Sequence, residues 1–142
     1  MANAKDVMMR LVTGFHRAVF QVSDGRLANR GNGMPVLQLT TTGRKSGKRR
    51  TTMLTSPVQD GDRMVLVASN GGDDRHTNWF LNLRDDPKVE VTMDGRTRPM
   101  RARVASPEEK AELWPRVVAA HRGYAQYQTR TDRDIPLVIL EP

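Results

Sequence analysis

The 142-residue chain contains no cysteine. This absence excludes disulfides and thiolate metal sites, and it agrees with a reducing cytoplasm. Long hydrophobic runs are missing too: the longest span a few residues, as at positions 137–140, whereas a membrane-spanning helix needs about 20. Arg10 and Arg17 interrupt the apolar N-terminal segment, which argues against a signal peptide. We therefore expect a single cytoplasmic domain.

Histidine and aromatic residues are also scarce. The three histidines, His16, His76 and His121, show no metal-ligand spacing, and no serine lies in a Gly-x-Ser-x-Gly setting. We expect no metal site, although a loop with Asp73, Asp74 and His76 offers polar groups. The seven Phe, Trp and Tyr residues are not interleaved with basic ones as stacking platforms would be, which argues against nucleic-acid binding.

Negative charge is scarce in the first part of the chain. Residues 1–60 hold ten Lys or Arg and three Asp or Glu, whereas residues 61–142 hold thirteen of each, so the whole excess of +7 lies in residues 1–60. Half of those ten cations form one cluster: Arg44, Lys45, Lys48, Arg49 and Arg50. Such a cluster attracts nucleic acid, anionic lipid or a small molecule bearing phosphate and carboxylate groups. The alternative is a solvated hairpin tip.

The hydrophobic pattern predicts an α+β fold. Residues 5–20 form an amphipathic helix followed by a loop over residues 23–34. Strands are expected over residues 35–41, 50–58, 64–69, 88–93, 98–104 and 135–140, with Asp94-Gly95 as a hairpin turn. Helices are expected over residues 77–83 and from the Ser106 cap, with its Glu109 capping box, to about His121.

Five to six short strands with helices set apart indicate a small, mostly antiparallel barrel. We expect residues 1–34 to form an N-terminal helix and loop. Residues 35–142 would form the barrel, within a single domain overall.

The basic stretch TTTGRKSGKRR, residues 40–50, does not match a P-loop. That motif needs four residues between its glycines and Ser or Thr after its lysine, whereas three residues separate Gly43 from Gly47 and Arg49 follows Lys48. The stretch also lies between two strands. A β-turn with glycines and cationic side chains can nevertheless bind an anion through backbone N–H groups and guanidinium forks.

Three further segments offer ligand contacts. The segment VASNGG, residues 67–72, places small residues directly after a buried strand, where a flat ligand can approach the backbone, or forms a plain turn. Trp79 and Phe80 belong to a ligand slot or to the core. Asn78 and Asn82 lie on one helix face, where they bind a polar ligand or cap local backbone.

A stripe of ring side chains recurs every three residues near the end of the last long helix: His121, Tyr124 and Tyr127. These groups can donate protons or stack on a substrate. The alternative is simple packing with the hydroxyls reaching water.

The order of these pieces resembles the deazaflavin-dependent nitroreductases and F420H2-dependent quinone reductases, an actinobacterial and archaeal-type family. The resemblance covers residues 35–142 and rests on TTTGRKSGKRRTT, VASNGGDDRHTNWFLNLRDDPKVEV, LWPRVV and YAQYQTRTDRDIPLVILEP, in the family's order. It implies a split β-barrel, like that of FMN-binding proteins. It also implies an oxidoreductase that passes a hydride from reduced coenzyme F420 to a quinone, nitroaromatic or conjugated enone acceptor.

The resemblance also implies roles for individual residues. The coenzyme's phosphate and oligoglutamate tail would be held by Arg44, Lys45 and Ser46, and the next part of the groove would be lined by Arg50, Thr51, Thr52, Met53 and Leu54. The residues flanking the ribityl chain and ring would be Val67, Ala68, Ser69, Asn70, Asn78, Trp79, Phe80 and Asn82. Tyr124 would lie near the ring, with His121 and Tyr127 beside the acceptor as catalytic candidates.

Three positions depart from the family pattern. Asn70 stands where some relatives carry lysine, which removes one cation, and Thr55 and His121 replace tyrosines. The last two reshape the acceptor pocket, so turnover of a given nitroaromatic does not follow from the resemblance.

Other interpretations stay open at this stage. They are an FMN-binding split-barrel oxidoreductase, a non-catalytic F420-binding protein and a basic nucleic-acid-binding module. FMN carries a single phosphate and no glutamates, so it makes less use of the cationic cluster. Residues 5–20, with Lys5, Arg10 and Arg17, either contact an anionic membrane surface peripherally or pack on the barrel mouth. The sequence does not specify an oligomeric state.

Overall fold

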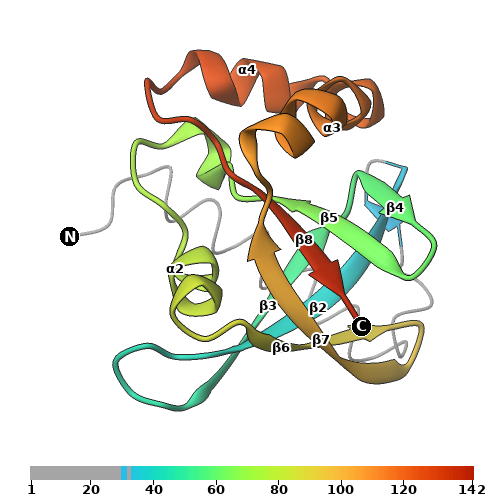
Figure 1. Ribbon diagram of the computed structural model, residues 1–142, viewed down its shortest axis with the longest axis vertical. Helices are drawn as coiled ribbons and strands as arrows, with labels where there is room; N and C mark the ends of the chain where they lie inside the picture. The colour runs from blue at the N-terminus through green and yellow to red at the C-terminus, as the bar shows by residue number, and fades with distance from the viewer. Residues whose placement is uncertain (1–29, 32) are drawn as a thin grey trace.

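The computed structural model describes residues 30–31 and 33–142. The helix predicted over residues 5–20 and most of the loop after it lie outside these residues. Within the described part, eight antiparallel strands form one curled sheet with the order β1-β2-β6-β7-β8-β5-β4, and β3 pairs with β2 (Figure 1). The strands are β1 (Arg30–Gly31), β2 (Met34–Thr42), β3 (Arg49–Thr55), β4 (Val58–Asp60), β5 (Arg63–Val67), β6 (Lys88–Met93), β7 (Arg96–Val104) and β8 (Leu137–Glu141).

The α+β split-barrel prediction is confirmed, with more strands than the five to six expected. One reason is that the strand predicted over residues 50–58 is two strands. Pro57 has no N–H to give to a ladder, and the buried Ser56 hydroxyl donates to the carbonyls of Val58 and Val65 at 3.0 and 2.8 Å. The chain therefore turns a corner here, from pairing with β2 to pairing with β5.

The predicted hairpin between β6 and β7 is confirmed. Asp94 and Gly95 have φ of 52° and 76°, which is the left-handed region that a tight two-residue turn requires. The register that follows places Val89 opposite Met100 and Val91 opposite Arg98. Val89, Val91 and Met100 are buried, so this face of the hairpin points into the barrel.

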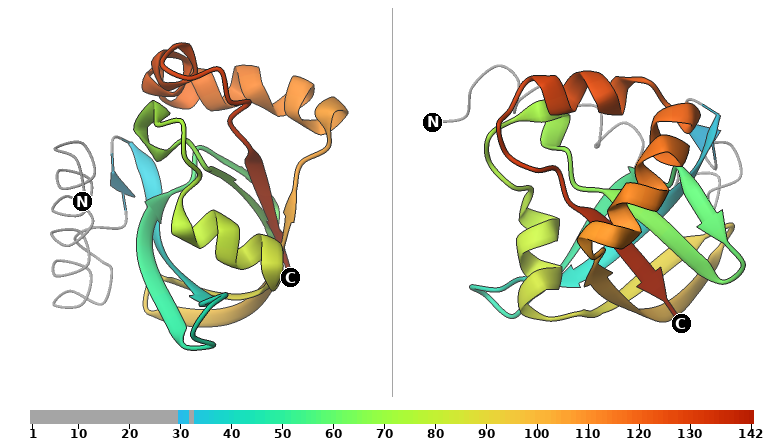
Figure 2. Two further views of the ribbon diagram at one scale, coloured as in Figure 1. Left: turned by 90° about the vertical axis from the view of Figure 1, so that its left-hand side faces the viewer. Right: turned by 45° about the horizontal axis from the view of Figure 1, so that its top comes forward.

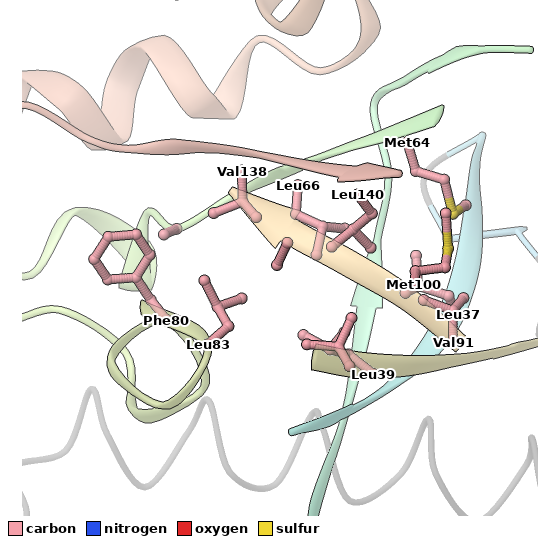
Figure 3. Close-up of a cluster of buried hydrophobic side chains, with 13 residues drawn as sticks. Leu37, Leu39, Met64, Leu66, Phe80, Leu83, Val91, Met100, Val138 and Leu140 are labelled. Carbon is pink, nitrogen blue, oxygen red and sulfur yellow. The ribbon is translucent and has the colours of Figure 1, made fainter. Parts of the chain in front are cut away.

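The core fills the inside of this barrel (Figure 3). Four strands contribute Leu37, Leu39, Leu66, Val91 and Leu140, and none of these side chains is measurably exposed. The alternation along β2 puts these side chains inward and leaves Gln38 and Thr40 half-buried on the other face. Burial of each large apolar side chain stabilises the fold by about 1.5–3 kcal/mol.

The helices occupy two places on the barrel. Helix α2 (Asn78–Asp85) lies beside the long β2–β3 hairpin, and α3 (Pro107–Ala120) and α4 (Gly123–Thr129) lie together over one end of the barrel (Figure 2). The Ser106–Glu109 capping box is confirmed: the Ser106 hydroxyl accepts from the Glu109 N–H at 3.2 Å, and the Glu109 carboxylate accepts from the Ser106 N–H at 2.9 Å. Among the described residues, no helix is both long and apolar enough to cross a membrane.

The prediction that one helix carries His121, Tyr124 and Tyr127 is wrong. Helix α3 ends at Ala120 with His121 as its extended C-cap, and a separate short helix, α4, begins at Gly123. Gly123 lets the chain reverse close to the His121 ring, because a Cβ at this glycine would lie 2.6 Å from His121 Nε2. The three side chains still lie close together, because Tyr124 meets the rings of both His121 and Tyr127 edge-on.

Candidate functional site

A cleft of about 470 Å³ lies between the β2–β3 hairpin and helix α2. Its lining combines cationic, hydroxyl, amide and aromatic groups. The lining residues are Thr41, Gly43, Arg44, Lys45, Ser46, Arg50, Thr51, Thr52, Asn78, Trp79 and Asn82. A concave site with convergent polar groups and one large aromatic ring is typical of a small-molecule site.

The tip of the β2–β3 hairpin is held by its own backbone. The Gly43 N–H donates to the Lys48 carbonyl at 2.7 Å, and the Gly47 N–H donates to the Gly43 carbonyl at 2.8 Å. Gly47 has φ of 72°, and a Cβ at Gly43 would lie 2.8 Å from Ser46 Oγ. The backbone conformation of Gly47 thus favours glycine, and a side chain at Gly43 would require Ser46 to shift.

Asn82 joins this hairpin to α2 from a buried position. Its side-chain oxygen accepts from the Arg44 N–H at 3.2 Å and from Arg44 Nη1 at 2.8 Å. Its amide nitrogen donates to Thr41 Oγ1 at 3.3 Å. Arg44 Nη2 also donates to Asn78 Oδ1 at 3.4 Å. Two asparagines one helical turn apart thus hold the Arg44 guanidinium over the cleft.

Positive charge is concentrated at this end of the cleft. Within the described part of the chain, Arg49 is the one cation of the cluster in an ion pair, with Glu90 at 3.1 Å. The partners of Arg44 are neutral amides, and Lys45, Lys48 and Arg50 are exposed. Four neighbouring cations without carboxylate partners among the described residues repel one another, which favours an anionic ligand at this place.

The other end of β3 meets the tyrosines of α4. Thr55 Oγ1 lies 3.4 Å from the Tyr124 hydroxyl, which also lies 4.0 Å from Met34 Sδ. Burial raises the pKa of Tyr124, so its hydroxyl stays protonated at neutral pH. Thr55 lies five positions after Arg50 along β3, a distance of about 17 Å at the usual rise per residue. The cations and the ring side chains thus lie at opposite ends of β3, and of this strand only Arg50, Thr51 and Thr52 line the cleft.

Tyr127 and His121 flank Tyr124. The ring centroid of Tyr124 lies 6.1 Å from that of Tyr127 and 5.2 Å from that of His121, both close to edge-on. The Arg130 guanidinium lies 5.5 Å from the Tyr127 ring centroid. Tyr127 and His121 are half-buried, so both retain contact with solvent, whereas Tyr124 is buried.

The structure gathers part of the predicted site in the cleft. The predicted cofactor residues that line it are Arg44, Lys45, Ser46, Arg50, Thr51, Thr52, Asn78, Trp79 and Asn82. Those that do not line it are Met53, Leu54, Val67, Ala68, Ser69, Asn70, Phe80 and Tyr124. Phe80, Leu54 and Ala68 pack in the main core, and Met53 packs against Val36.

Sequence reasoning missed three residues of this region. Thr41 and Gly43 line the cleft, and both fall in the basic stretch, so their position beside the cations was an available signal. Arg133 contacts the loop after β5 and lies in an irregular segment, where periodicity gives no signal. Among the residues described, no group of three His, Asp or Glu side chains could hold a metal ion.

The carboxylates of the loop considered as a metal site, Asp73 and Asp74, instead bind other side chains of the protein. Asp73 forms an ion pair with Arg75 at 3.0 Å. Asp74 accepts from the Thr131 hydroxyl at 2.6 Å.

Comparisons with known proteins show the family to which the chain belongs. The model of the F420H(2)-dependent quinone reductase family matches residues 10–142. An F420H(2)-dependent quinone reductase of Mycobacterium tuberculosis is 39% identical over 129 residues, which cover 88% of this chain and 86% of the relative. A second M. tuberculosis protein, a putative F420H(2)-dependent quinone reductase, is 35% identical over 134 residues, covering 94% and 99%.

A solved structure extends the likeness to three dimensions. The F420-H2 dependent reductase FDR-A superposes with a TM-score of 0.68 at 41% identity, covering 75% of this chain and 94% of that one. The chain therefore belongs to the F420H(2)-dependent quinone reductases, a family of oxidoreductases whose cofactor is reduced coenzyme F420.

Proposed function

We propose that the cleft between the β2–β3 hairpin and α2 binds reduced coenzyme F420, and that the protein passes its hydride to a quinone-type acceptor held near α4. The observation that carries this assignment is the group of four cations without carboxylate partners in the described structure, on the hairpin that forms one wall of the cleft. The coenzyme is a flat ring joined to a phosphodiester and several carboxylates. One end of the coenzyme is thus anionic and the other is flat, just as one end of β3 carries cations and the other lies beside the ring side chains of α4.

The donor set of the hairpin fits the acidic end. Lys45 and Arg50 face the cleft with charged groups, and Ser46 adds a hydroxyl. Charge-assisted hydrogen bonds of this kind contribute about 1.5–3 kcal/mol each, so several together bind tightly without a covalent link. Arg44 has a second role, because its guanidinium also ties the hairpin to Asn82.

The middle of the cleft fits the uncharged part of the coenzyme. Thr51 and Thr52 offer hydroxyls along β3, and Trp79 offers a flat indole surface across from them. We infer that the backbone of residues 67–70 borders the ring, where small side chains permit close approach. The bound coenzyme supplies the hydride, while the protein orients it and excludes water.

The acceptor end is assigned to the ring side chains of α4. Tyr127 and His121 are half-buried next to buried Tyr124, so they can orient a polar acceptor or supply a proton to it. Quinones, nitroaromatics and conjugated enones are all flat molecules with carbonyl or nitro oxygens that accept such hydrogen bonds. We expect Tyr127→Phe or His121→Phe, whichever removes the proton donor, to lower turnover about 10²-fold or more, with coenzyme affinity unchanged. Normal turnover by both variants would refute the assignment.

The function is tested by fluorescence titration with coenzyme F420 and, in parallel, with FMN. We expect saturable binding of F420 and much weaker binding of FMN, because FMN lacks the carboxylate tail. Oxidation of the reduced coenzyme is then followed with a menaquinone analogue as acceptor. Tighter binding of FMN would favour the FMN-dependent alternative, and binding of F420 without turnover of any acceptor would favour a non-catalytic carrier.

The cellular location follows from the acceptor in this proposal. We infer a cytoplasmic enzyme whose residues 5–20 contact the inner face of the cell membrane, where quinones reside. These residues lie outside the described structure, so the contact stays a prediction from their sequence. Liposome flotation with and without residues 1–20 tests it, and equal binding would contradict it.

A further inference from the structure

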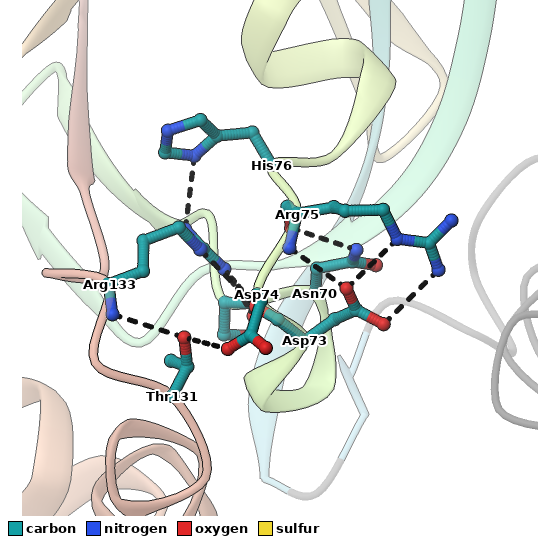
Figure 4. A network of polar contacts seen from close by, with 8 residues as sticks. Asn70, Asp73, Asp74, Arg75, His76, Thr131 and Arg133 are labelled. Atoms are coloured by element: carbon teal, nitrogen blue, oxygen red, sulfur yellow. Dashed lines mark hydrogen bonds and ion pairs between the residues drawn. The ribbon is translucent and has the colours of Figure 1, made fainter.

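The Arg133 guanidinium makes five contacts with the loop of residues 68–76, which connects β5 to α2; Figure 4 shows Arg133 beside Asp73 and His76 of this loop. Its Nε donates to the Asp73 carbonyl at 3.2 Å, and its Nη2 donates to the carbonyls of Ser69 and Asp73, both at 3.0 Å. Its Nη1 donates to the Ala68 carbonyl at 3.2 Å and lies 3.0 Å from His76 Nδ1. A guanidinium has five N–H groups, and Arg133 makes five contacts with the loop, so each N–H group can have its own acceptor.

The loop needs such support because its backbone is unusual. Asn70, Gly71 and Gly72 are three consecutive residues with positive φ, at 48°, 64° and 82°. A non-glycine residue in this region is uncommon, and three in a row do not form a repeating, self-supporting element. The loop's own backbone bonds are short-range, from the Gly72 N–H to the Ser69 carbonyl and from the Asp73 N–H to the Asn70 carbonyl.

Arg133 is itself fixed by helix α4. The Gln128 side chain of α4 donates to the Arg133 carbonyl at 2.7 Å and accepts from the Ile135 N–H at 3.0 Å. The Arg133 N–H donates to Thr131 Oγ1 at 3.1 Å. The guanidinium thus projects from a segment held at both of its ends to the helix that carries Tyr124 and Tyr127.

We propose that Arg133 is a positioning residue that holds the loop of residues 68–76 in its binding conformation and fixes it relative to α4. This proposal rests on the proposed function, in which the backbone of residues 67–70 borders the coenzyme ring and α4 carries the acceptor side chains. Arg133 touches neither ligand. It keeps the two ligand-facing segments at a set separation, because its guanidinium contacts one while its backbone is bonded to the other.

A lysine at this position would keep the charge but not the geometry. An ammonium has three N–H donors around one nitrogen, whereas the guanidinium spreads five over a planar fork. Lysine therefore leaves at least two of the five contacts unmade. Alanine leaves all of them unmade, including those to the carbonyls of Ala68 and Ser69, both of which are buried residues.

The first test is native-state hydrogen exchange, measured without coenzyme, on Arg133→Lys, Arg133→Ala and the control Arg116→Lys. Arg116 forms a comparable two-pronged contact with Asp60 on another part of the barrel. We expect the Gly72 and Asp73 amides to exchange on the order of tenfold faster in Arg133→Lys, with the β5 amides unchanged. The control should leave both sets unchanged. Equal protection of the two loop amides in Arg133→Lys and the wild type would overturn the proposal.

The second test measures coenzyme affinity by fluorescence. In Arg133→Lys the loop opens slightly more often, so most molecules still have it in the conformation that binds coenzyme. The affinity of Arg133→Lys for coenzyme should therefore stay within a few-fold of the wild type. The affinity of Arg133→Ala should fall on the order of tenfold or more. Guanidinium ion, well below denaturing concentrations, should restore affinity to Arg133→Ala and not to a Lys45→Ala variant. Unaltered affinity in Arg133→Ala, or loss without rescue, would overturn the positioning role.

The two tests separate the two hypotheses. If the wild type binds no coenzyme, the proposed function fails while the exchange result still decides whether Arg133 holds the loop. If Arg133→Ala does not fold, the decision rests on Arg133→Lys. Faster exchange of the β5 amides together with the loop amides would then show general destabilisation and contradict the proposal.

Discussion

Asn82 illustrates how a single buried amide serves the candidate site. Its exposed fraction is 4%, and its side chain bonds both Arg44 and Thr41, whose exposed fraction is 1%. Removing the amide leaves the Thr41 hydroxyl unpaired in the interior, and an unpaired buried polar group costs about 1–3 kcal/mol. We predict that Asn82→Ala lowers the free energy of unfolding by this amount in urea titrations.

A neighbouring residue provides the control. Asn78 contacts the same guanidinium but is exposed, so Asn78→Ala should change the free energy of unfolding by less than about 0.5 kcal/mol. Equal effects of the two substitutions would contradict a special role for the buried amide.

His76 makes stability depend on pH. Burial, together with the charges of Arg133 and Arg84, lowers the pKa of His76 below its ordinary value of 6.5. The unfolded chain therefore takes up a proton at a higher pH than the folded protein does. Stability is complete above about pH 6.5 and falls as the pH drops below that value, until folded His76 is protonated too.

The corresponding experiment compares urea midpoints at several pH values in the wild type and in His76→Gln. The difference between the two proteins isolates His76 from the other titrating groups. We predict that the wild type loses more stability than the variant between pH 7 and pH 5. Parallel curves would show that His76 has the same pKa in both states.

The sequence alone predicted a residue of the candidate site only where the chemistry of its side chain pointed to a ligand. The cluster around Lys45 and Arg50 was recognisable because like charges crowded together need an anion. Arg133 was not, because its importance lies in four contacts to backbone carbonyls and one to the His76 ring, all distant in sequence. Phe80 shows the opposite case: the alternative that it belongs to the core is the one the structure supports.

At the scale of elements, α4 packs directly on the loop after β5. A Cβ on Gly72 would lie 2.6 Å from the Tyr127 carbonyl oxygen, and Gly72 has φ of 82°. We predict that Gly72→Ala lowers the free energy of unfolding by about 3 kcal/mol or more, because backbone strain adds to a clash. Chemical denaturation measures this value directly.

Gly61 separates the two causes. It has φ of 62° but open space around its Cβ position, so Gly61→Ala should cost about 1–2 kcal/mol from strain alone. If Gly72→Ala costs no more than Gly61→Ala, α4 and the loop are not in tight contact.

The elements themselves were largely predictable, and the exceptions have local causes. The alternation of apolar and polar residues, together with the turn residues, predicted β2, β6 and β7. The capping box predicted the start of α3. The break between β3 and β4 was missed because Thr- and Val-rich sequence continues on both sides of Pro57. The end of α3 was missed because spacing of three residues also fits two helices that meet at a turn.

At the scale of the whole molecule, charge and shape act together. The barrel interior is filled by side chains, so we expect a ligand to lie on the outside, in the cleft between β3 and α2. In the proposed function, the cationic hairpin determines which end of the coenzyme lies beside it. The cationic hairpin was predicted from the charge count and the family resemblance, whereas the contacts between α4 and the loop of residues 68–76 required the structure.

The most direct test of the account is coenzyme affinity after charge reversal at the hairpin. Lys45→Glu with Arg50→Glu removes two cations that face the cleft but spares Arg44 and its bond to Asn82. The control reverses Lys88 and Arg101, an exposed pair on β6 and β7, with the same change in net charge.

We predict that the hairpin variant binds coenzyme F420 on the order of 100-fold more weakly in fluorescence titrations, and the control within a few-fold of the wild type. Equal affinity of the hairpin variant and the control would contradict the account.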